Sequence, residues 1–291
     1  MASISRKKFR YLLLVVLVLS LVFYVATIFA QENYEDKLKV YYFNVGQGNG
    51  SLIRTPLGQD IIIDGGPEDD FYKQVQDVLP WNDRDIELMI VTHPHEDHYK
   101  GLLGLLNNFQ VKRIVLSPVK YESKGFLNFI ELVNMEGAVV DFLEDDKKYI
   151  FDKVSLEIFL PFLIKEVDKI KNMNEGSLVT RVVFDQSEFL FPGDIEIGAE
   201  SFLVKLGSNL QSDVLLSPHH GSSTSSSKDF LNLIKPILII ISSGINNKYH
   251  HPNEGTLMNY TKAGFEILRT DIQGGILLIS DGLSVQRVPY P

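Results

Sequence analysis

Short apolar runs typical of β-strands recur along most of the chain after residue 39. They cover residues 40–43, 51–54, 60–64, 87–92, 113–116, 155–160, 177–184, 188–191, 213–217, 237–242, 266–269, 275–280 and 283–287. Between them, six segments carry apolar residues at helical spacing: 71–79, 98–106, 126–135, 197–206, 226–234 and 254–263. Strand runs mixed with helices, some in hairpin series and others in βα units, predict a layered α/β domain in which helices cover sheets.

The first thirty residues follow a different pattern. Four basic residues within the first ten precede a nearly continuous apolar run over residues 11–29. A helix of this length is about what is needed to cross a hydrocarbon core of ~30 Å. We therefore predict a cytoplasmic basic segment (1–10), a single-pass membrane anchor (11–30) and a linker (31–38), followed by a domain outside the cytoplasm. Cleavage after Ala30, which would give a secreted protein, is the alternative.

The remaining residues, 39–291, are enough for one domain with an ample core. The chain has no cysteine, which excludes both a disulfide framework and a thiolate metal site. Because the first ten residues contribute +4 to a total charge of −9, residues 11–291 carry −13. A domain this acidic is not expected to hold duplex DNA through a broad basic face. Bound divalent ions would offset part of that charge locally.

All seven histidines of the chain fall into three short clusters. The clusters lie at residues 93–98, 219–220 and 250–251, and each follows an apolar run that is typical of a strand. In α/β folds, binding sites form in the loops beyond the carboxyl ends of strands. The three clusters are therefore expected to meet at one rim of the domain.

The first cluster, HPHEDH, has the spacing of metal ligands. Side chains two residues apart point the same way in extended backbone, and Pro94 favours an extended residue before it. His93, His95 and Asp97 are therefore expected to face one side, and His98 joins them if a helix begins there. The segment offers three imidazoles and one carboxylate, and together with ligands from other loops this is more than one tetrahedral ion needs, which predicts two neighbouring ions.

Three other acidic residues have distinct expected places. Asp194, in a glycine-containing turn after a buried strand, is the expected bridge between the two ions, and a helix N-cap is its alternative role. Asp64, in IIIDGG, is expected to orient an imidazole of the first cluster, and an ordinary turn residue is the alternative. Glu96 is expected to point away from the ions into solvent.

The second and third clusters carry weaker predictions. The side chains of His219 and His220 are adjacent in sequence and should diverge, so only one of them is expected to reach the ions. For His250 and His251, a place in the site and a purely local role in the loop are equally compatible with the sequence.

These residues are where the chain resembles a known family. HPHEDH matches the HxHxDH signature of the metallo-β-lactamase fold, and Asp194 matches its GD motif. More narrowly, the chain over residues 39–282 resembles the extracellular hydrolase-like domain of ComEC competence proteins. The motifs that carry this resemblance are NVGQGNGSLI from residue 44, IDGG at 63–66, NMNEGSLV at 172–179, FPGD at 191–194, DVLLSPHHGSSTS at 213–225 and NKYHHP at 247–252.

The resemblance implies a four-layer αββα sandwich with the site at one edge of its two sheets. It implies as metal ligands His93, His95, Asp97, His98, Asp194 (the bridge) and His219. It places His220 and His251 beside the substrate phosphate or leaving group, where either would act as a general acid. The chain departs from the family in its first loop, where Asn44 and Asn49 replace the usual aspartates. It also lacks the additional histidine that many superfamily hydrolases have between the two motifs.

Together these features predict a membrane-anchored hydrolase facing outward, with two divalent ions, Zn²⁺ or Mn²⁺. The ions would lower the pKa of a bridging water toward ~7 and so supply a hydroxide nucleophile, which Asp97 would orient. The expected substrate is a phosphodiester, either DNA or a component of the cell envelope, and no protein partner is inferred. The alternatives are an amide or ester hydrolase of the lactamase type and a non-catalytic metal-binding subunit of DNA uptake.

Overall fold

The computed structural model describes residues 7–8, 10, 12–21 and 36–291. The chain divides into two compact units, Met1–Lys37 and Leu38–Pro291. In the first unit, residues 12–21 are helical and their apolar side chains are exposed. The predicted anchor lies partly outside the described residues, at 11 and 22–30, as does most of the predicted linker. Within the part of the chain that the structure describes, no helix is long and apolar enough to span a bilayer.

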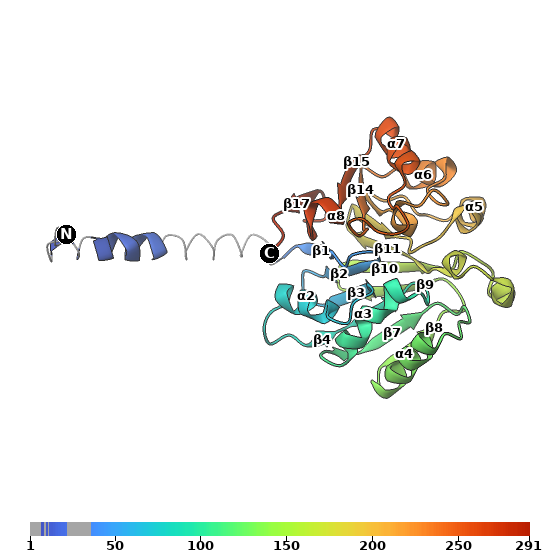
Figure 1. The fold of residues 1–291 in the computed structure, drawn as a ribbon, viewed down its shortest axis with the longest axis horizontal. Coiled ribbons are helices and arrows are strands. Elements are labelled where there is room, and N and C mark those ends of the chain that lie inside the picture. Colours follow the sequence, from blue (N-terminus) through green and yellow to red (C-terminus); the bar gives the residue numbers. More distant parts are fainter. Residues whose placement is uncertain (1–6, 9, 11, 22–35) are drawn as a thin grey trace. The chain divides into compact units, whose positions relative to one another are not determined.

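The second unit contains two large β-sheets (Figure 1). The first sheet has eight strands in the order β17-β16-β1-β2-β3-β5-β7-β8. In chain order these are β1 (Leu38–Tyr42), β2 (Gly50–Arg54), β3 (Asp60–Gly65), β5 (Leu88–Val91), β7 (Arg113–Leu116), β8 (Val139–Phe142), β16 (Ile276–Ser280) and β17 (Val285–Val288). The strands β3, β5, β7 and β8 run parallel to one another, and the others pair antiparallel.

The second sheet has seven strands in the order β15-β14-β13-β12-β11-β10-β9. They are β9 (Lys147–Phe151), β10 (Val154–Phe159), β11 (Val179–Phe184), β12 (Ser187–Phe191), β13 (Val214–Leu216), β14 (Leu238–Ile241) and β15 (Glu266–Arg269). The strands β12 to β15 are parallel. A small ladder joins β4 (Asp85–Ile86) to β6 (Gln110–Val111).

Helices cover the outer faces of both sheets (Figure 1). On the first sheet lie α2 (Phe71–Val78), α3 (Glu96–Leu106) and α4 (Lys124–Met135). On the second lie α5 (Ile197–Leu206), α6 (Lys228–Ile234) and α7 (Glu254–Ala263). The short helices are α8 (Thr270–Gln273), η1 (Ile164–Lys169), η2 (Met173–Gly176) and η3 (Pro218–Gly221). The predicted α/β layering is confirmed, with two sheets between two helical layers.

The main core lies between the sheets, where side chains from both inner faces form one apolar cluster. Tyr42 of the first sheet stacks on Phe191 of the second, with ring centroids 5.6 Å apart. The strands β3 and β5 are buried along their whole length, because helices cover their outer faces. This explains why their sequences are continuous apolar runs rather than alternating ones.

The predicted elements are present, and the differences are mostly at their ends. The strands β8 and β9 were not predicted, because both are sheet edges with exposed and charged positions rather than clean apolar alternation. The serine-rich segment before α6 ends in an N-cap, since the side chain of Ser227 accepts a hydrogen bond from Phe230 N. The helix α3 begins at Glu96 rather than at residue 98, which changes how Asp97 reaches the site.

Candidate metal centre

The histidine clusters meet at one edge of the paired sheets. The loops that converge there follow β1, β3, β5, β12, β13 and β14, and η2 precedes β11 at the same place. Most of these strands belong to the parallel parts of the two sheets, so their carboxyl ends share an edge. The predicted common rim is therefore present.

The loop after β5 supplies the first group of side chains. His93 is buried and His95, which is extended, forms the N-cap of α3. His93 Nε2 lies 3.0 Å from His95 Nδ1, so the two imidazoles face each other as the alternation predicts. Asp97 was expected on the same extended segment, but it projects from the first turn of α3 together with His98. Glu96 is exposed, as predicted.

Asp64 orients His98. Its Oδ2 accepts hydrogen bonds from His98 Nδ1 and from Thr92 Oγ1, both at 2.8 Å, and its Oδ1 accepts one from Thr92 N at 2.9 Å. This arrangement leaves Nε2 of His98 as the atom that faces the rim. Asp64 therefore contacts an imidazole of the first cluster, as predicted, and the side chain of Thr92 is a partner that the sequence analysis missed.

Asp194 lies at the centre of the site and is 2 % exposed. The preceding Gly193 has a φ of 58°, and a Cβ there would lie 2.9 Å from the side chains of both Ser177 and Thr92. Glycine is therefore required for the turn. Ser177 Oγ accepts a hydrogen bond from Asp194 N at 3.1 Å. The N-cap of α5 is Glu196, so the alternative role of Asp194 as a helix cap is not observed.

The arrangement of His219 and His220 differs from the predicted one. Both adopt left-handed backbone, with φ of 49° and 55°, and this bend brings two adjacent side chains to the same carboxylate. His220 Nε2 lies 3.4 Å from Asp194 Oδ2 and 3.4 Å from Asp97 Oδ2. His219 Nε2 is 4.0 Å from the same Asp194 oxygen. Non-glycine residues in this backbone region store strain, which is typical of functional sites.

Four residues form a compact set of donors suited to a metal ion: Asp97, His98, Asp194 and His220. One ligand atom from each lies within 4.8 Å of all the others. His220, which was expected beside the substrate, is thus inside the cluster, whereas His219, expected as a ligand, is outside this set. His98 Nε2, Asp194 Oδ1 and His220 Nε2 are buried and make no well-aligned hydrogen bond among the described residues; their contacts are ion-pair distances of 3.3–3.4 Å within the cluster itself.

These unpaired atoms fit a metal ion well. Buried polar atoms are almost always satisfied, so three of them converging on one point indicate a missing partner. The donors are imidazole nitrogens and carboxylate oxygens, a set that suits Zn²⁺ and Mn²⁺. His93 and His95 add two further nitrogens beside the cluster, with His93 Nε2 3.9 Å from Asp194 Oδ2.

The pKa shifts of the site describe a tightly coupled charge balance. Burial opposes the charged form of Asp194, but His220 and His98 outweigh it and hold the pKa of its carboxyl well below the usual value. Burial also opposes protonation of His98 and His220, yet Asp194 raises the pKa of both, that of His220 to about 9. Without metal, the imidazolium groups of His98 and His220 balance the buried carboxylate of Asp194 and the partly exposed carboxylate of Asp97. A divalent ion supplies the same compensation and leaves the imidazoles neutral.

Three other histidines, His93, His95 and His251, have lowered pKa values and therefore favour the neutral form. Burial, reinforced by His98, lowers the pKa of both His93 and His95, which suits them to bind metal as neutral imidazoles. Burial, together with His220 and His219, lowers the pKa of His251 to about 4.

The third histidine cluster is split by the structure. The ring of His251 lies 5.3 Å from that of His219 and 6.3 Å from that of His220, so it belongs to the site. Its Nδ1 is buried and, within the described chain, unpaired. His250 is exposed and lines neither cavity of the site.

Two residues that the sequence analysis did not assign to the site support His219. Glu196 Oε1 lies 3.3 Å from His219 Nδ1 and accepts a hydrogen bond from Asn174 Nδ2 at 3.1 Å. Asn174 also lies 3.5 Å from His219 Nε2, and its Oδ1 is buried and unpaired in the described structure. The available signal for Glu196 was its position two residues after Asp194.

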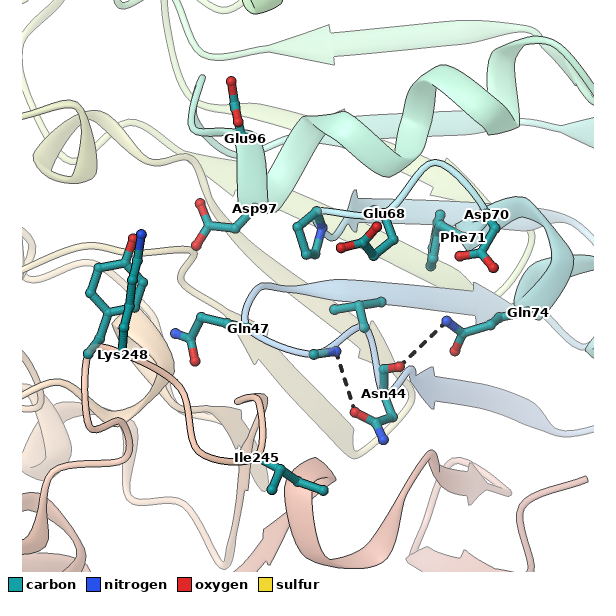
Figure 2. A pocket seen from close by; sticks show the side chains of 15 residues that line it. Asn44, Gln47, Glu68, Asp70, Phe71, Gln74, Glu96, Asp97, Ile245 and Lys248 are labelled. Atoms are coloured by element: carbon teal, nitrogen blue, oxygen red, sulfur yellow. Dashed lines mark hydrogen bonds between the residues drawn. The ribbon is translucent and has the colours of Figure 1, made fainter.

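Two cavities open at this edge. The smaller, about 320 Å³, is lined by Asp97, Asp194 and His220 of the cluster and also by His95, His219, His251 and Asn174. The larger, about 750 Å³, adjoins it and extends between the β1–β2 loop, α2 and the loop after β14 (Figure 2). Gln47, Glu96, Asp97 and Tyr249 line both cavities, so they form one continuous depression.

Comparison with known proteins agrees with this geometry. Competence protein ComA of Neisseria gonorrhoeae is 38% identical over 260 residues, which cover 87% of this chain and 34% of that protein. ComE operon protein 3 of Bacillus subtilis (strain 168) is 24% identical over 266 residues, covering 82% and 32% of the two chains. This chain therefore spans about a third of the length of these curated relatives. Their similarity confirms the resemblance to ComEC-like proteins.

Solved structures share the fold. CmlA, a diiron β-hydroxylase from Streptomyces venezuelae, superposes with a TM-score of 0.55 at 13% identity, over 87% of this chain and 54% of that chain. Residues 43–241 match the sequence family described as the Metallo-beta-lactamase superfamily. With more than half of its length in that match and a candidate metal cluster at the expected edge of two packed sheets, the chain belongs to the metallo-β-lactamase superfamily.

Proposed function

We propose that this chain is a metal-dependent phosphodiesterase with two divalent ions, Zn²⁺ or Mn²⁺, at the rim of its two sheets. One observation carries the proposal. Asp97, His98, Asp194 and His220 converge within 4.8 Å, and three of their buried ligand atoms make no well-aligned hydrogen bond in the described structure and contact only one another or Asp97 at ion-pair distances. Such a site is costly to bury unless an ion completes it.

The residues divide into two ligand groups. Asp97, His98 and His220 would hold one ion, His93 and His95 the other, and Asp194 would be shared because its carboxylate lies within 4 Å of both groups. His219, 4.0 Å from Asp194, remains a candidate for the second ion, as the family resemblance implies.

Bound divalent ions would acidify a water and accept the negative charge that develops on the phosphoryl oxygens. The chain's own groups would prepare the site for that chemistry. Asp64 holds the ring of His98 in one tautomer, with Nε2 free. His251 stands outside the cluster beside His219, so it is the better placed of the two predicted acids to contact the leaving oxygen. Because its pKa is lowered to about 4, it would be a neutral imidazole that donates a hydrogen bond from its N–H to the leaving oxygen, and not the general acid that the family resemblance implies.

The choice of phosphodiester rests on the relatives. ComA is named as a competence protein, and Recombination protein 2 of Haemophilus influenzae, 23% identical over 84% of this chain, is named for recombination. Those names support a nucleic acid strand as one substrate candidate and a role in DNA uptake. A membrane anchor at residues 11–30 and a domain facing outward would fit an envelope phosphodiester equally well.

The test uses the full chain in detergent, stripped with EDTA and reloaded with Zn²⁺ or Mn²⁺. Hydrolysis of bis(p-nitrophenyl) phosphate is followed for the wild type, for Asp194→Asn and for Asp152→Asn, an exposed turn residue far from the site along the chain. We expect metal-dependent turnover for the wild type and for Asp152→Asn, and no turnover for Asp194→Asn. Stoichiometric metal binding without turnover would instead favour the amide-hydrolase or binding-subunit alternative.

A further inference from the structure

Apart from Asp97, the residues that line the larger cavity beside the metal centre are not among the candidate metal ligands. This cavity is continuous with the cluster through Asp97 and Gln47, which line both cavities. The β1–β2 loop forms its floor and is held tightly against α3. A Cβ at Gly48, whose φ is 149°, would lie 2.3 Å from the carbonyl oxygen of Asp97. With a volume of about 750 Å³, the cavity is large enough for one arm of a substrate whose phosphate lies at the cluster.

The charge of this cleft disfavours a polyanion. Figure 2 shows Asp97 and Lys248 toward one end, and Glu68 and Asp70 toward the end formed by α2. Among the described residues that line the cleft, Glu68, Asp70 and Glu96 are acidic besides the candidate metal ligand Asp97, and one, Lys248, is basic. A nucleic acid strand has a phosphate at every nucleotide and binds mainly through cations that neutralise it. With one phosphate of the strand at the metal cluster, the next phosphate in the cleft would lie farther from Lys248 and closer to Glu68 and Asp70.

The hydrogen-bonding groups of the cleft match hydroxyls. The cleft is lined by the amides of Asn44, Gln47 and Gln74, each of which uses one polar atom in a hydrogen bond to the backbone. Amides both donate and accept, and carboxylates such as Glu68 only accept. A phosphate also only accepts, so it cannot satisfy a carboxylate, whereas a hydroxyl donates to carboxylates and exchanges both kinds of bond with amides.

An aromatic side chain stands where the two cavities meet. Tyr249 is 55% exposed, and its ring stacks on that of His251 with centroids 5.8 Å apart. A half-exposed tyrosine offers an apolar face together with a polar hydroxyl. This combination suits the C–H face of a sugar or polyol that carries hydroxyls around its edge.

We propose that the cleft binds an uncharged, hydroxyl-rich alcohol, a sugar or polyol, which a phosphodiester at the metal cluster joins to the rest of the substrate. This proposal rests on the phosphodiesterase function proposed above and chooses the envelope class of substrate over a nucleic acid strand. In the reaction, water supplies the oxygen that bonds to phosphorus and the phosphorus–oxygen bond to one alcohol breaks. That alcohol leaves with a proton, and a phosphate monoester remains.

The test compares three phosphodiesters on the metal-loaded full chain in detergent. They are glycerophosphoglycerol, the dinucleotide thymidylyl-thymidine, and an oligothymidylate of four residues. Alkaline phosphatase releases inorganic phosphate from monoester products alone, so one coupled assay serves all three. We compare kcat/KM per scissile bond. We expect this value to be highest for glycerophosphoglycerol and lowest for the oligothymidylate. The reverse order would overturn the proposal in favour of a nucleic acid strand.

A charge reversal tests the cleft itself. Glu68 is exposed and lines the end of the cleft near α2. Glu68→Lys is expected to raise kcat/KM for the oligothymidylate about fivefold, the effect of reversing one charge at about 8 Å in water, and to lower it for glycerophosphoglycerol. Glu131→Lys, on the exposed surface of α4, makes the same change in net charge. It should leave kcat/KM unchanged for both substrates. If Glu68→Lys and Glu131→Lys changed kcat/KM equally, the assignment of the cleft as the binding site of an uncharged alcohol would be overturned.

Binding separates this proposal from the proposed function. Glycerol 3-phosphate and a short 5′-phosphorylated oligothymidylate are titrated into the metal-loaded chain, and heat is measured without any turnover. If glycerol 3-phosphate binds more tightly and no diester is hydrolysed, the cleft assignment stands and the phosphodiesterase proposal fails. If diesters are hydrolysed but the oligothymidylate binds more tightly, the cleft assignment fails alone.

Discussion

Replacing Asp64 with asparagine tests whether this carboxylate prepares His98 to bind metal. The two side chains have the same shape, and asparagine tolerates the left-handed backbone that Asp64 adopts, with a φ of 57°. The fold is therefore expected to survive. The substitution converts one acceptor oxygen into an amino group, while Asp64 uses both oxygens as acceptors, toward His98 Nδ1 and toward Thr92.

Either orientation of the new amide disturbs the site. If the amino group faces His98, it donates a hydrogen bond to Nδ1, which must then be unprotonated. The ring proton therefore lies on Nε2, the nitrogen that would otherwise bind the ion. If the amino group faces Thr92 N, two donors oppose each other in a buried place, which costs about 1–3 kcal/mol. Loss of such an orienting partner typically lowers metal affinity about 10- to 100-fold, equivalent to about 1.4–2.7 kcal/mol.

The assay is a competition titration of Zn²⁺ between the protein and a chromophoric chelator, with thermal unfolding measured in parallel. Asp152→Asn is the matched control, because Asp152 is also a left-handed aspartate, with a φ of 53°, but is exposed in the turn between β9 and β10. Asp64→Asn should weaken binding at least tenfold and the control should not. Wild-type affinity in a folded Asp64→Asn protein would refute the role assigned to Asp64.

Three further predictions concern the cluster and the core. Burial opposes protonation of His220, but Asp194 raises its pKa to about 9 from an ordinary 6.5. This stabilisation is complete below pH 6.5 and is lost as the pH rises through 9, so calorimetry should show a falling Tm over that window in EDTA but not with bound metal. His220→Ala should reduce metal stoichiometry measured by mass spectrometry more than His219→Ala does, and an equal loss would favour the original prediction for His219. Phe191→Ala, which removes the ring stacked on Tyr42 between the sheets, should lower the free energy of unfolding by about 3–5 kcal/mol in denaturant titrations. A loss below about 1 kcal/mol would show that this contact does not anchor the core.

Most of the secondary structure could be predicted because burial leaves a direct mark on the sequence. The strands β3 and β5, buried on both faces, are continuous apolar runs, and β10 alternates between buried and half-buried residues. The edge strands β8 and β9 could not be predicted in this way. Their residues are largely exposed, so they carry charged and apolar positions without a clear period.

The candidate site was predicted at the level of loops more reliably than at the level of atoms. The position of each histidine cluster after a strand was enough to bring the clusters to one edge. The expected extended path through Asp97 was wrong, because α3 begins at Glu96 and presents Asp97 from its first turn. Residue spacing alone does not reveal a helix that starts two residues earlier.

The sequence by itself determined which chemical groups are available and where along the chain they occur: imidazoles and carboxylates directly after buried strands, and no thiolate. Parallel strands bring their carboxyl ends to a common edge, so these groups had to meet. Only the tertiary structure decided which ones meet. The left-handed backbone at His219 and His220 turns both toward Asp194 and places His220 deeper. Likewise, the walls of the adjoining cleft come from loops about two hundred residues apart, near Gln47 and Tyr249. Their combination depends on long-range packing that no local pattern encodes.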